Sequence, residues 1–208
     1  LHSDIVIFSF HAVKVITSAE GGMALTNNKK ISEKMSELRT HGITRNKEKF
    51  NSTPTNEIWN YQQINLGYNY RMSEVQAALG LSQMKNLNKF IQIRRDIAKI
   101  YNNNLTTNFF EKPLQRKNTF SSYHLYPLIL KKTGNKAQIK LFKYLSKNGV
   151  LPNLHYIPVH LQPYYKNLGF RRGDFPIAEK YFSKAISLPI YPTLTNGQQN
   201  KIIKLINS

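Results

Sequence analysis

The stretch Ser9-Phe10-His11-Ala12-Val13-Lys14 holds the most informative feature of the chain, a lysine that follows an apolar segment. A second stretch, Thr17-Ser18-Ala19-Glu20-Gly21-Gly22, comes next and ends in a Gly-Gly pair typical of a tight turn. Because Ile5–Phe10 is apolar and predicts a buried strand, Lys14 is expected just beyond the strand end, beside whatever cleft the sheet borders. A lysine held there can lose its proton through desolvation and attack a carbonyl to form a Schiff base. The alternative is a solvated lysine in a lysine-rich chain.

Length and composition favour a folded chain. Its 208 residues are 40% hydrophobic, enough for one domain or two small ones with a buried core. The absence of cysteine excludes disulfides, thiolate metal sites and a cysteine nucleophile. No apolar run approaches the length of a membrane-spanning helix, so no membrane partner is expected. The sequence opens at Leu1-His2-Ser3-Asp4 and enters a strand almost at once, so we expect it to continue a longer polypeptide.

The net charge of +19 raises the alternative of a basic nucleic-acid binder. The lysines are spread along the chain among many asparagines, and no zinc finger, RNA-recognition signature or basic zipper occurs. Exposed helix faces rich in Lys and Asn explain the charge more simply, so we expect no nucleic-acid partner. DNA affinity that collapses with added salt, in a chain without yellow colour, would instead favour the binder.

The first part of the chain predicts two strands and a helix. The second strand is Gly22–Thr26, after the glycine turn, and Lys30–Thr40 has apolar residues at helical spacing. Gly42 is a plausible helix terminator. Residues 43–67 are polar and predict one long loop.

The remaining elements predict a mixed α/β chain. Ser73 and Gln76 form a capping box that opens a helix reaching Phe90, and a further helical stretch runs from Ile91 to about Leu105. The polar residues 106–120 form a linker and the best candidate for a domain boundary. Beyond it we expect strands at Tyr123–Leu130 and Leu151–Ile157, helices at Lys136–Asn148 and Pro176–Ile186, and a last helix opened by the capping box Thr195-Asn196-Gly197-Gln198.

Two segments together resemble the DegT/DnrJ/EryC1/StrS family of sugar aminotransferases, which use pyridoxal phosphate (PLP). They are the lysine segment and Leu66-Gly67-Tyr68-Asn69-Tyr70-Arg71-Met72-Ser73. The resemblance implies that Lys14 binds PLP covalently, that Ser9 contacts the cofactor phosphate, and that Asn69 reaches across a dimer interface to the phosphate of the partner subunit. An amide donor before a capped helix fits that role, although a turn asparagine is the alternative reading.

The resemblance also implies the fold. We expect an α/β fold of the aspartate aminotransferase type (fold type I), present as a partial large domain with interface helices over residues 1–110. Residues 111–208 would form the small C-terminal α/β domain. In full-length relatives about 170 residues precede the lysine strand, on the usual domain scale of ~100–200 residues. That part carries the aspartate for the pyridine nitrogen and the aromatic residue that stacks on the ring.

Three further segments extend the resemblance. Leu38–Ile43 matches the region after the lysine-bearing strands, but His41 within it could be structural and is not assigned a catalytic role. Asn153–Tyr165 is similar to the substrate side of the small domain, where His155 is the candidate for a sugar contact. The alternative is a satisfied core histidine. Ala185–Pro192 also looks family-like and is expected to pack.

The amino-acid sequence around Lys14 is most similar to that of the family branch that aminates UDP-linked 4-keto-6-deoxy-hexosamines, as in pseudaminic acid synthesis. Ala12 and Val15 depart from it, because prolines are usual there and stiffen the loop. The implied reaction moves an amino group, from glutamate in most of the family, to the C4 ketone of the sugar nucleotide. The implied enzyme is a cytoplasmic homodimer that uses no metal.

The resemblance leaves open what this chain does by itself. Without the preceding part it is expected to be crippled as an aminotransferase, and a catalytically dead remnant that survives as a folded module is the alternative. A neighbouring reading frame that encodes the missing domain would separate these two readings.

Overall fold

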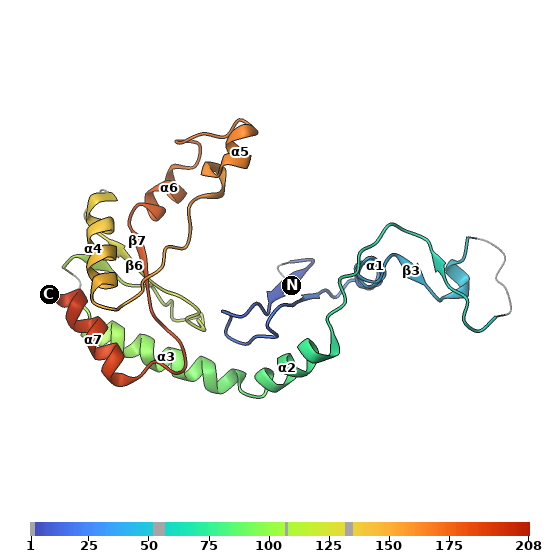
Figure 1. Cartoon of the computed structure of the whole chain (residues 1–208), viewed down its shortest axis with the longest axis horizontal. Coiled ribbons are helices and arrows are strands. Elements are labelled where there is room, and N and C mark those ends of the chain that lie inside the picture. Colours follow the sequence, from blue (N-terminus) through green and yellow to red (C-terminus); the bar gives the residue numbers. More distant parts are fainter. Residues whose placement is uncertain (1–2, 52–56, 107, 132–134) are drawn as a thin grey trace. The chain divides into compact units, whose positions relative to one another are not determined.

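In the computed structural model the chain forms two compact units, Leu1–Leu87 and Asn88–Ser208 (Figure 1). The structure describes residues 3–51, 57–106, 108–131 and 135–208. The sequence-based division of this chain into residues 1–110 and 111–208 stays a prediction. No helix in the described ranges is both long and apolar enough to cross a membrane.

The first unit contains two small sheets and two helices. Strands β1 (Val6–Ser9) and β2 (Gly22–Leu25) form an antiparallel hairpin, and β3 (Ile43–Thr44) pairs with β4 (Gln62–Gln63). Helix α1 (Lys29–Arg39) follows the hairpin, the 3₁₀ turn η1 (Lys47–Lys49) follows β3, and α2 (Glu74–Met84) closes the unit. The expected helix stop holds, because Gly42 adopts a φ of 68° just beyond α1.

Three expectations in this unit need correction. The strand over Ile5–Phe10 forms, but its residues are exposed instead of buried. Residues 43–67 are not one irregular loop, because β3, η1 and β4 lie within them; residues 52–56 are outside the described ranges. The capping box at Ser73 is confirmed, yet its helix ends at Met84, since the chain turns at Lys85–Asn86 and not near Phe90.

The second unit is a three-stranded antiparallel sheet covered by helices. The strands are β5 (Phe110–Glu111), β6 (Tyr126–Leu130) and β7 (Ala185–Leu188), in the order β5-β6-β7. Helices α3 (Leu87–Asn104), α4 (Asn135–Lys147) and α7 (Asn196–Asn207) pack on it, and their apolar residues share one core with Leu128 and Ile186. The second capping box, Thr195 with Gln198, opens α7 as expected.

An irregular segment between α4 and β7 carries the short elements η2 (Val159–Leu161), α5 (Pro163–Asn167) and α6 (Pro176–Phe182). The strand expected at Leu151–Ile157 does not form, because only Asn153 pairs, in a single bridge with Ser187. The helix expected to reach Ile186 ends at Phe182, since Ala185–Leu188 joins the sheet as β7 beside β6.

Candidate functional site

Lys14 lies on a loop that leaves β1 and returns to β2. The Phe10 carbonyl oxygen closes the base of this loop, accepting from Thr17 Oγ1 at 3.0 Å and from the Ser18 amide at 2.9 Å. Within the loop, the Lys14 amide donates to the His11 carbonyl at 2.9 Å. These bonds fix the backbone on both sides of the lysine, so the position of Lys14 is set by main-chain contacts.

Buried residues on the return side of the loop anchor it further. Ile16 and Ser18 are buried, and the Ser18 hydroxyl donates to the Glu20 carbonyl at 2.9 Å. A Cβ on Gly21 would lie 2.5 Å from Ser18 Oγ and 2.5 Å from Met72 Cε, and its φ of 153° also favours glycine. The Gly-Gly turn is therefore required by close packing as well as by backbone conformation.

The Lys14 side chain is half-buried, and its Nζ makes no hydrogen bond or ion pair with any residue the structure describes. An amine without a protein partner, on a loop with a fixed backbone, suits covalent attachment to an aldehyde cofactor. Among the described residues, no hydrogen bond to Nζ has to break before this amine reacts.

Ser9 is the last residue of β1 and lies opposite Gly22 in the hairpin register. It is exposed, and its Oγ accepts only a long contact, 3.5 Å, from the His11 amide. Its hydroxyl hydrogen remains available for an anionic oxygen such as a phosphate. Ser9 thus ends β1, and Lys14 closes the turn that begins at His11, while the roles of both residues in cofactor binding stay predictions.

Asn69 lies on a segment bound to the C-terminal end of α1. Amides of Tyr68 and Tyr70 donate to the Leu38 and Arg39 carbonyls at 2.8 and 3.0 Å, and Asn69 itself bridges to Thr40. Its side chain is exposed, and in the described residues no hydrogen bond joins it to Ser9 or Lys14. The local backbone fixes Asn69 at the surface of the first unit.

Arg71 was not singled out from the sequence, although it lies in the same segment. Its Nε donates to Asn69 Oδ1 at 3.4 Å, and a terminal nitrogen of its guanidinium lies 3.4 Å from His41 Nε2. Because arginine only donates, His41 Nε2 is the acceptor in this contact. With its oxygen engaged, the Asn69 amide keeps two N–H donors for a phosphate.

His155 lies in the second unit, on the irregular segment and not on a strand. Its Nδ1 is 2.9 Å from Ser187 Oγ, and its ring meets the Tyr156 ring edge-on at a centroid distance of 4.6 Å. This partly buried histidine is held in place by its neighbours. A role in sugar contact stays a prediction.

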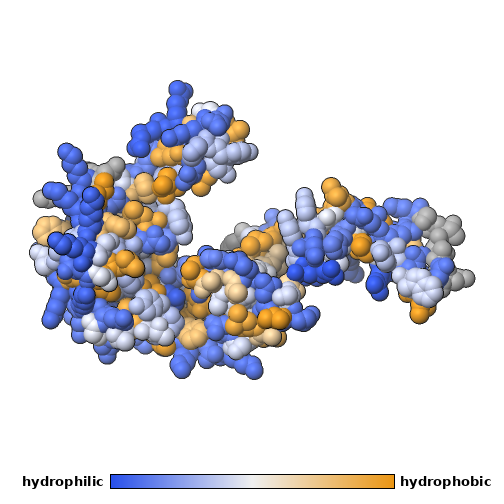
Figure 2. All heavy atoms as spheres, in the orientation of Figure 1, coloured by the Kyte–Doolittle hydropathy of each residue, from blue (hydrophilic) through white to orange (hydrophobic). Residues whose placement is uncertain are grey.

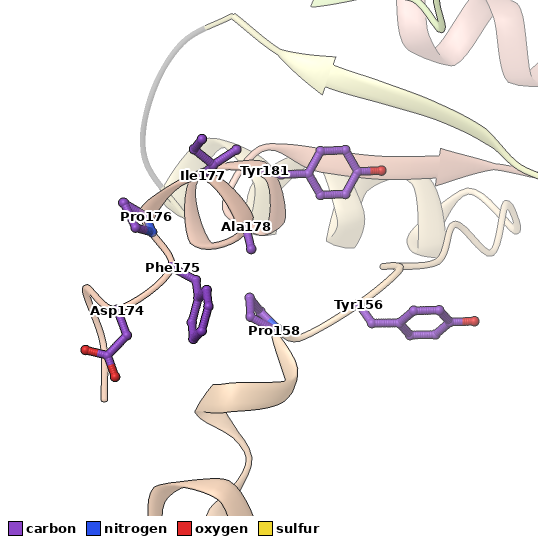
Figure 3. A pocket seen from close by; sticks show the side chains of 8 residues that line it. All are labelled: Tyr156, Pro158, Asp174, Phe175, Pro176, Ile177, Ala178 and Tyr181. Atoms are coloured by element: carbon purple, nitrogen blue, oxygen red, sulfur yellow. The ribbon is translucent and has the colours of Figure 1, made fainter. Parts of the chain in front are cut away.

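An open groove of about 610 Å³ lies beside His155 in the second unit and falls within the usual range for small-molecule sites. Figure 3 shows the Phe175 ring facing Pro158, with the Ala178 methyl pointing toward the same proline. Its lining is mainly apolar and includes Tyr156 and Tyr181, with Asp174 at the margin. Sequence reasoning missed this groove because its wall comes from separate segments.

A hydrogen bond between His160 and the partly buried Glu179 supports the loop that forms one side of this groove. His160 Nε2 lies 2.9 Å from Glu179 Oε1, and the same oxygen accepts from the Gly173 amide at 2.7 Å. The hydrogen bonds from His160 and Gly173 lower the pKa of Glu179 below its ordinary value. Among the described residues, no group of three or more His, Cys, Asp or Glu side chains could hold a metal.

Comparison with known proteins places this chain in a family of aminotransferases. The chain belongs to the DegT/DnrJ/EryC1/StrS aminotransferase family, whose model matches residues 2–207. An uncharacterized protein of Methanocaldococcus jannaschii is 38% identical over 208 residues, which cover 99% of this chain and 53% of that protein. The UDP-4-amino-4,6-dideoxy-N-acetyl-beta-L-altrosamine transaminase of Campylobacter jejuni is 33% identical over 205 residues, which cover 97% of this chain and 51% of the relative.

Solved structures agree with this assignment. PseC of Helicobacter pylori, an aminotransferase of pseudaminic acid biosynthesis, superposes with a TM-score of 0.86 at 31% identity, over 98% of this chain and 52% of PseC. The PLP form of the sugar aminotransferase Spr1654 of Streptococcus pneumoniae gives 0.87 at 29% identity, over 99% of this chain and 51% of Spr1654. The family and the α/β, fold type I class expected from the sequence are confirmed, and PLP is the cofactor of this family. The chain spans about half the length of these relatives.

Proposed function

We propose that this chain carries the lysine-bearing half of a PLP-dependent sugar-nucleotide aminotransferase. The observation that carries the proposal is Lys14. Lys14 lies five residues after Ser9, on a loop whose backbone is fixed by hydrogen bonds. In the described residues its Nζ has no protein partner. The family model matches residues 2–207 of the chain. The substrate we propose is a UDP-linked 4-keto-6-deoxy-hexosamine. Support comes from the lysine segment and from similarity to transaminases of that specificity.

The residues present fit PLP in part. The Lys14 amine suits the aldehyde, and the Ser9 hydroxyl and Asn69 amide suit the phosphate, because all three groups are open to an incoming ligand. When bound, PLP supplies the electron sink for amino transfer. Lys14 Nζ holds the cofactor and later accepts and returns the proton that moves during transfer. Ser9 and Asn69 orient the cofactor by its phosphate, and His155 would contact the sugar.

Activity is proposed for the assembled enzyme and not for these 208 residues alone. The chain spans only about half of its relatives, and no described residue takes the role of the acid that pairs with the pyridine nitrogen. We propose a homodimer that acts in the cytoplasm, with an amino acid as donor, and by family precedent we propose glutamate. The second candidate is a folded remnant without activity, and it is favoured by the chain's span of only about half of its relatives. Ala12 and Val15, in place of the usual prolines, remove a source of loop stiffness but not the chemistry of Lys14.

Covalent labelling tests the proposal. The chain is combined with the half of the C. jejuni transaminase that it does not match, incubated with PLP, reduced with borohydride and mapped by peptide mass. The pyridoxyl mass should lie on Lys14 and disappear in Lys14→Ala, whereas Lys29→Ala should keep it. Label on Lys29 or Lys30 contradicts the assignment, and no label on any lysine supports the inactive remnant.

A further inference from the structure

The positive charge of the chain is concentrated in the second unit. Residues 88–208 contain 20 of the 30 Lys and Arg residues but only 4 of the 11 Asp and Glu residues, so this unit has a formal net charge of +16 out of +19. Between Glu111 and Asp174 the sequence has twelve Lys and Arg residues and no acidic residue. Charge of one sign over so long a stretch attracts polyanions.

Helix α4 gathers four of these cations on one side. The spacing of four, three and four residues places them along a single face of the helix. All four side chains are exposed, and none forms an ion pair with any residue that the structure describes. Figure 2 shows hydrophilic residues, in blue, over this helix. This surface, the α4 lysine face, consists of Lys136, Lys140, Lys143 and Lys147.

The opposite side of α4 is fixed to the core of the second unit. Gln138 Nε2 donates to the Phe182 and Ala185 carbonyls at 2.8 and 2.6 Å. Leu145 is fully buried in the core. The α4 lysine face therefore points away from the sheet. Burial of four ammonium groups beneath another part of the protein is costly unless carboxylates meet them, so we expect this face to stay open in the assembled enzyme.

Two partly exposed apolar side chains flank the α4 lysine face. Ile139, four residues before Lys143, is 49% exposed, and Tyr144, four residues after Lys140, is 41% exposed. Lysine stems and an amphipathic tyrosine suit a lipid–water interface, where ammonium groups meet phosphate headgroups and apolar groups enter below them. A nucleic-acid site would favour the planar donor fork of arginine, which this face lacks.

We propose that the α4 lysine face binds the surface of an anionic phospholipid bilayer. The contact is peripheral, so it needs no membrane-spanning helix, and the described ranges contain none. The inference concerns where the protein binds and not its chemistry. It therefore goes beyond the proposed amino transfer and does not require Lys14 to react.

Co-sedimentation of the full chain with lipid vesicles tests the proposal. The chain should bind vesicles of equal parts phosphatidylcholine and phosphatidylglycerol, should not bind phosphatidylcholine alone, and should dissociate as salt is added. The double change Lys140→Gln with Lys143→Gln should weaken binding at least ~10-fold, because each lysine near an anionic surface contributes several-fold. Lys29→Gln with Lys30→Gln removes the same charge from exposed sites on α1 and should leave binding nearly unchanged.

A third variant separates a lipid surface from a nucleic acid. Ile139→Gln should weaken binding to the anionic vesicles and leave any affinity for duplex DNA unchanged, because only the bilayer receives its side chain. Glutamine is a good helix former, so all these variants should keep the parent circular dichroism spectrum.

Three outcomes would overturn the proposal. Absence of binding to the anionic vesicles rejects it directly, and equal losses in the two lysine pairs show that only the overall charge matters. Affinity for duplex DNA that depends on Lys140 and Lys143, without vesicle binding, assigns the face to nucleic acid. Lys14→Ala should bind vesicles normally; vesicle binding without any borohydride label rejects the proposed chemistry and keeps the lipid-binding face.

Discussion

His160 Nε2 and Glu179 Oε1 lie 2.9 Å apart, and this hydrogen bond between a buried histidine and a partly buried glutamate ties η2 to α6. The centroids of the Phe175 and His160 rings lie 4.8 Å apart. The Gly173 amide donates a hydrogen bond to Glu179 Oε1, the oxygen that also contacts His160. One carboxylate oxygen on α6 therefore joins η2 and the Gly173 loop, which adjoin the residues that line the groove.

Acid should loosen this part of the second unit. The folded pKa of Glu179 lies below the ordinary value of 4.5, mainly through the hydrogen bond from His160 and then that from Gly173. Because this pKa is lower in the folded state, the ionised Glu179 stabilises the fold at pH values above the pKa of the unfolded state. This contribution is lost as the pH falls through the pKa of the folded state. Glu179→Gln should destabilise the chain at pH 7 and speed exchange of the Gly173 amide.

The difference in the free energy of unfolding between Glu179→Gln and the parent chain should become smaller as the pH falls below about 4.5. Glu33→Gln is the matched control, because Glu33 makes an exposed ion pair with Lys49 and should change little. Urea denaturation at several pH values measures both variants. A difference in the free energy of unfolding that stays constant with pH would show that the Glu179 charge does not stabilise the fold.

Arg94→Met should destabilise the second unit by about 2–4 kcal/mol, because it removes a buried cation bonded to main-chain oxygens. One guanidinium nitrogen donates to the Ile190 carbonyl at 2.8 Å and to the Tyr123 and His124 carbonyls at 3.4 and 3.3 Å. Arg95→Met is the control: Arg95 stacks on Phe120 at the surface, so about 0.5–1 kcal/mol is expected. Equal losses in denaturant unfolding would reject the role given to Arg94.

Asn69→Ala should weaken PLP binding by about 1–3 kcal/mol, the usual cost of leaving a charged acceptor without its donor. A fluorescence titration of the chain joined to the unmatched half measures this loss. Asn86→Ala, on the turn after α2, is a matched control that should bind PLP normally.

A mixture of Asn69→Ala and Lys14→Ala chains tests whether Asn69 serves the partner subunit. If it does, both defects of a mixed dimer fall on one site and the other site is intact, so mixing should restore activity. Absence of recovery, with dimer exchange verified by mass, would place Asn69 in its own subunit's site.

Substrate preference should follow the similarity around Lys14. The assembled enzyme is expected to aminate UDP-linked 4-keto-6-deoxy-N-acetylhexosamines faster than dTDP-linked or perosamine-type substrates. Relatives include GDP-perosamine synthases at 29–31% identity, so the comparison is informative. Equal or reversed preference in a competition assay, read by product mass, would assign the chain to another branch.

The sequence by itself determined features that depend on neighbouring residues. The capping boxes at Ser73 and Thr195 and the glycine stop at Gly42 occur as predicted, because each is a hydrogen bond or a φ angle within one turn. The position of Lys14 just beyond the end of β1 was predictable from the local apolar pattern. The family could be identified because the short segments around Lys14 and Asn69 resemble those of the family in sequence.

Only the tertiary structure decided which elements are buried and which segments pair. Ala185–Leu188 became β7 and not the end of a helix, because β6 offers it a hydrogen-bonding edge far away in sequence. His160 and Glu179, 19 residues apart, met through packing that no local pattern specifies. The expected burial of β1 was wrong, because what covers a strand depends on long-range partners that its apolar residues do not specify, and its residues are exposed in this chain.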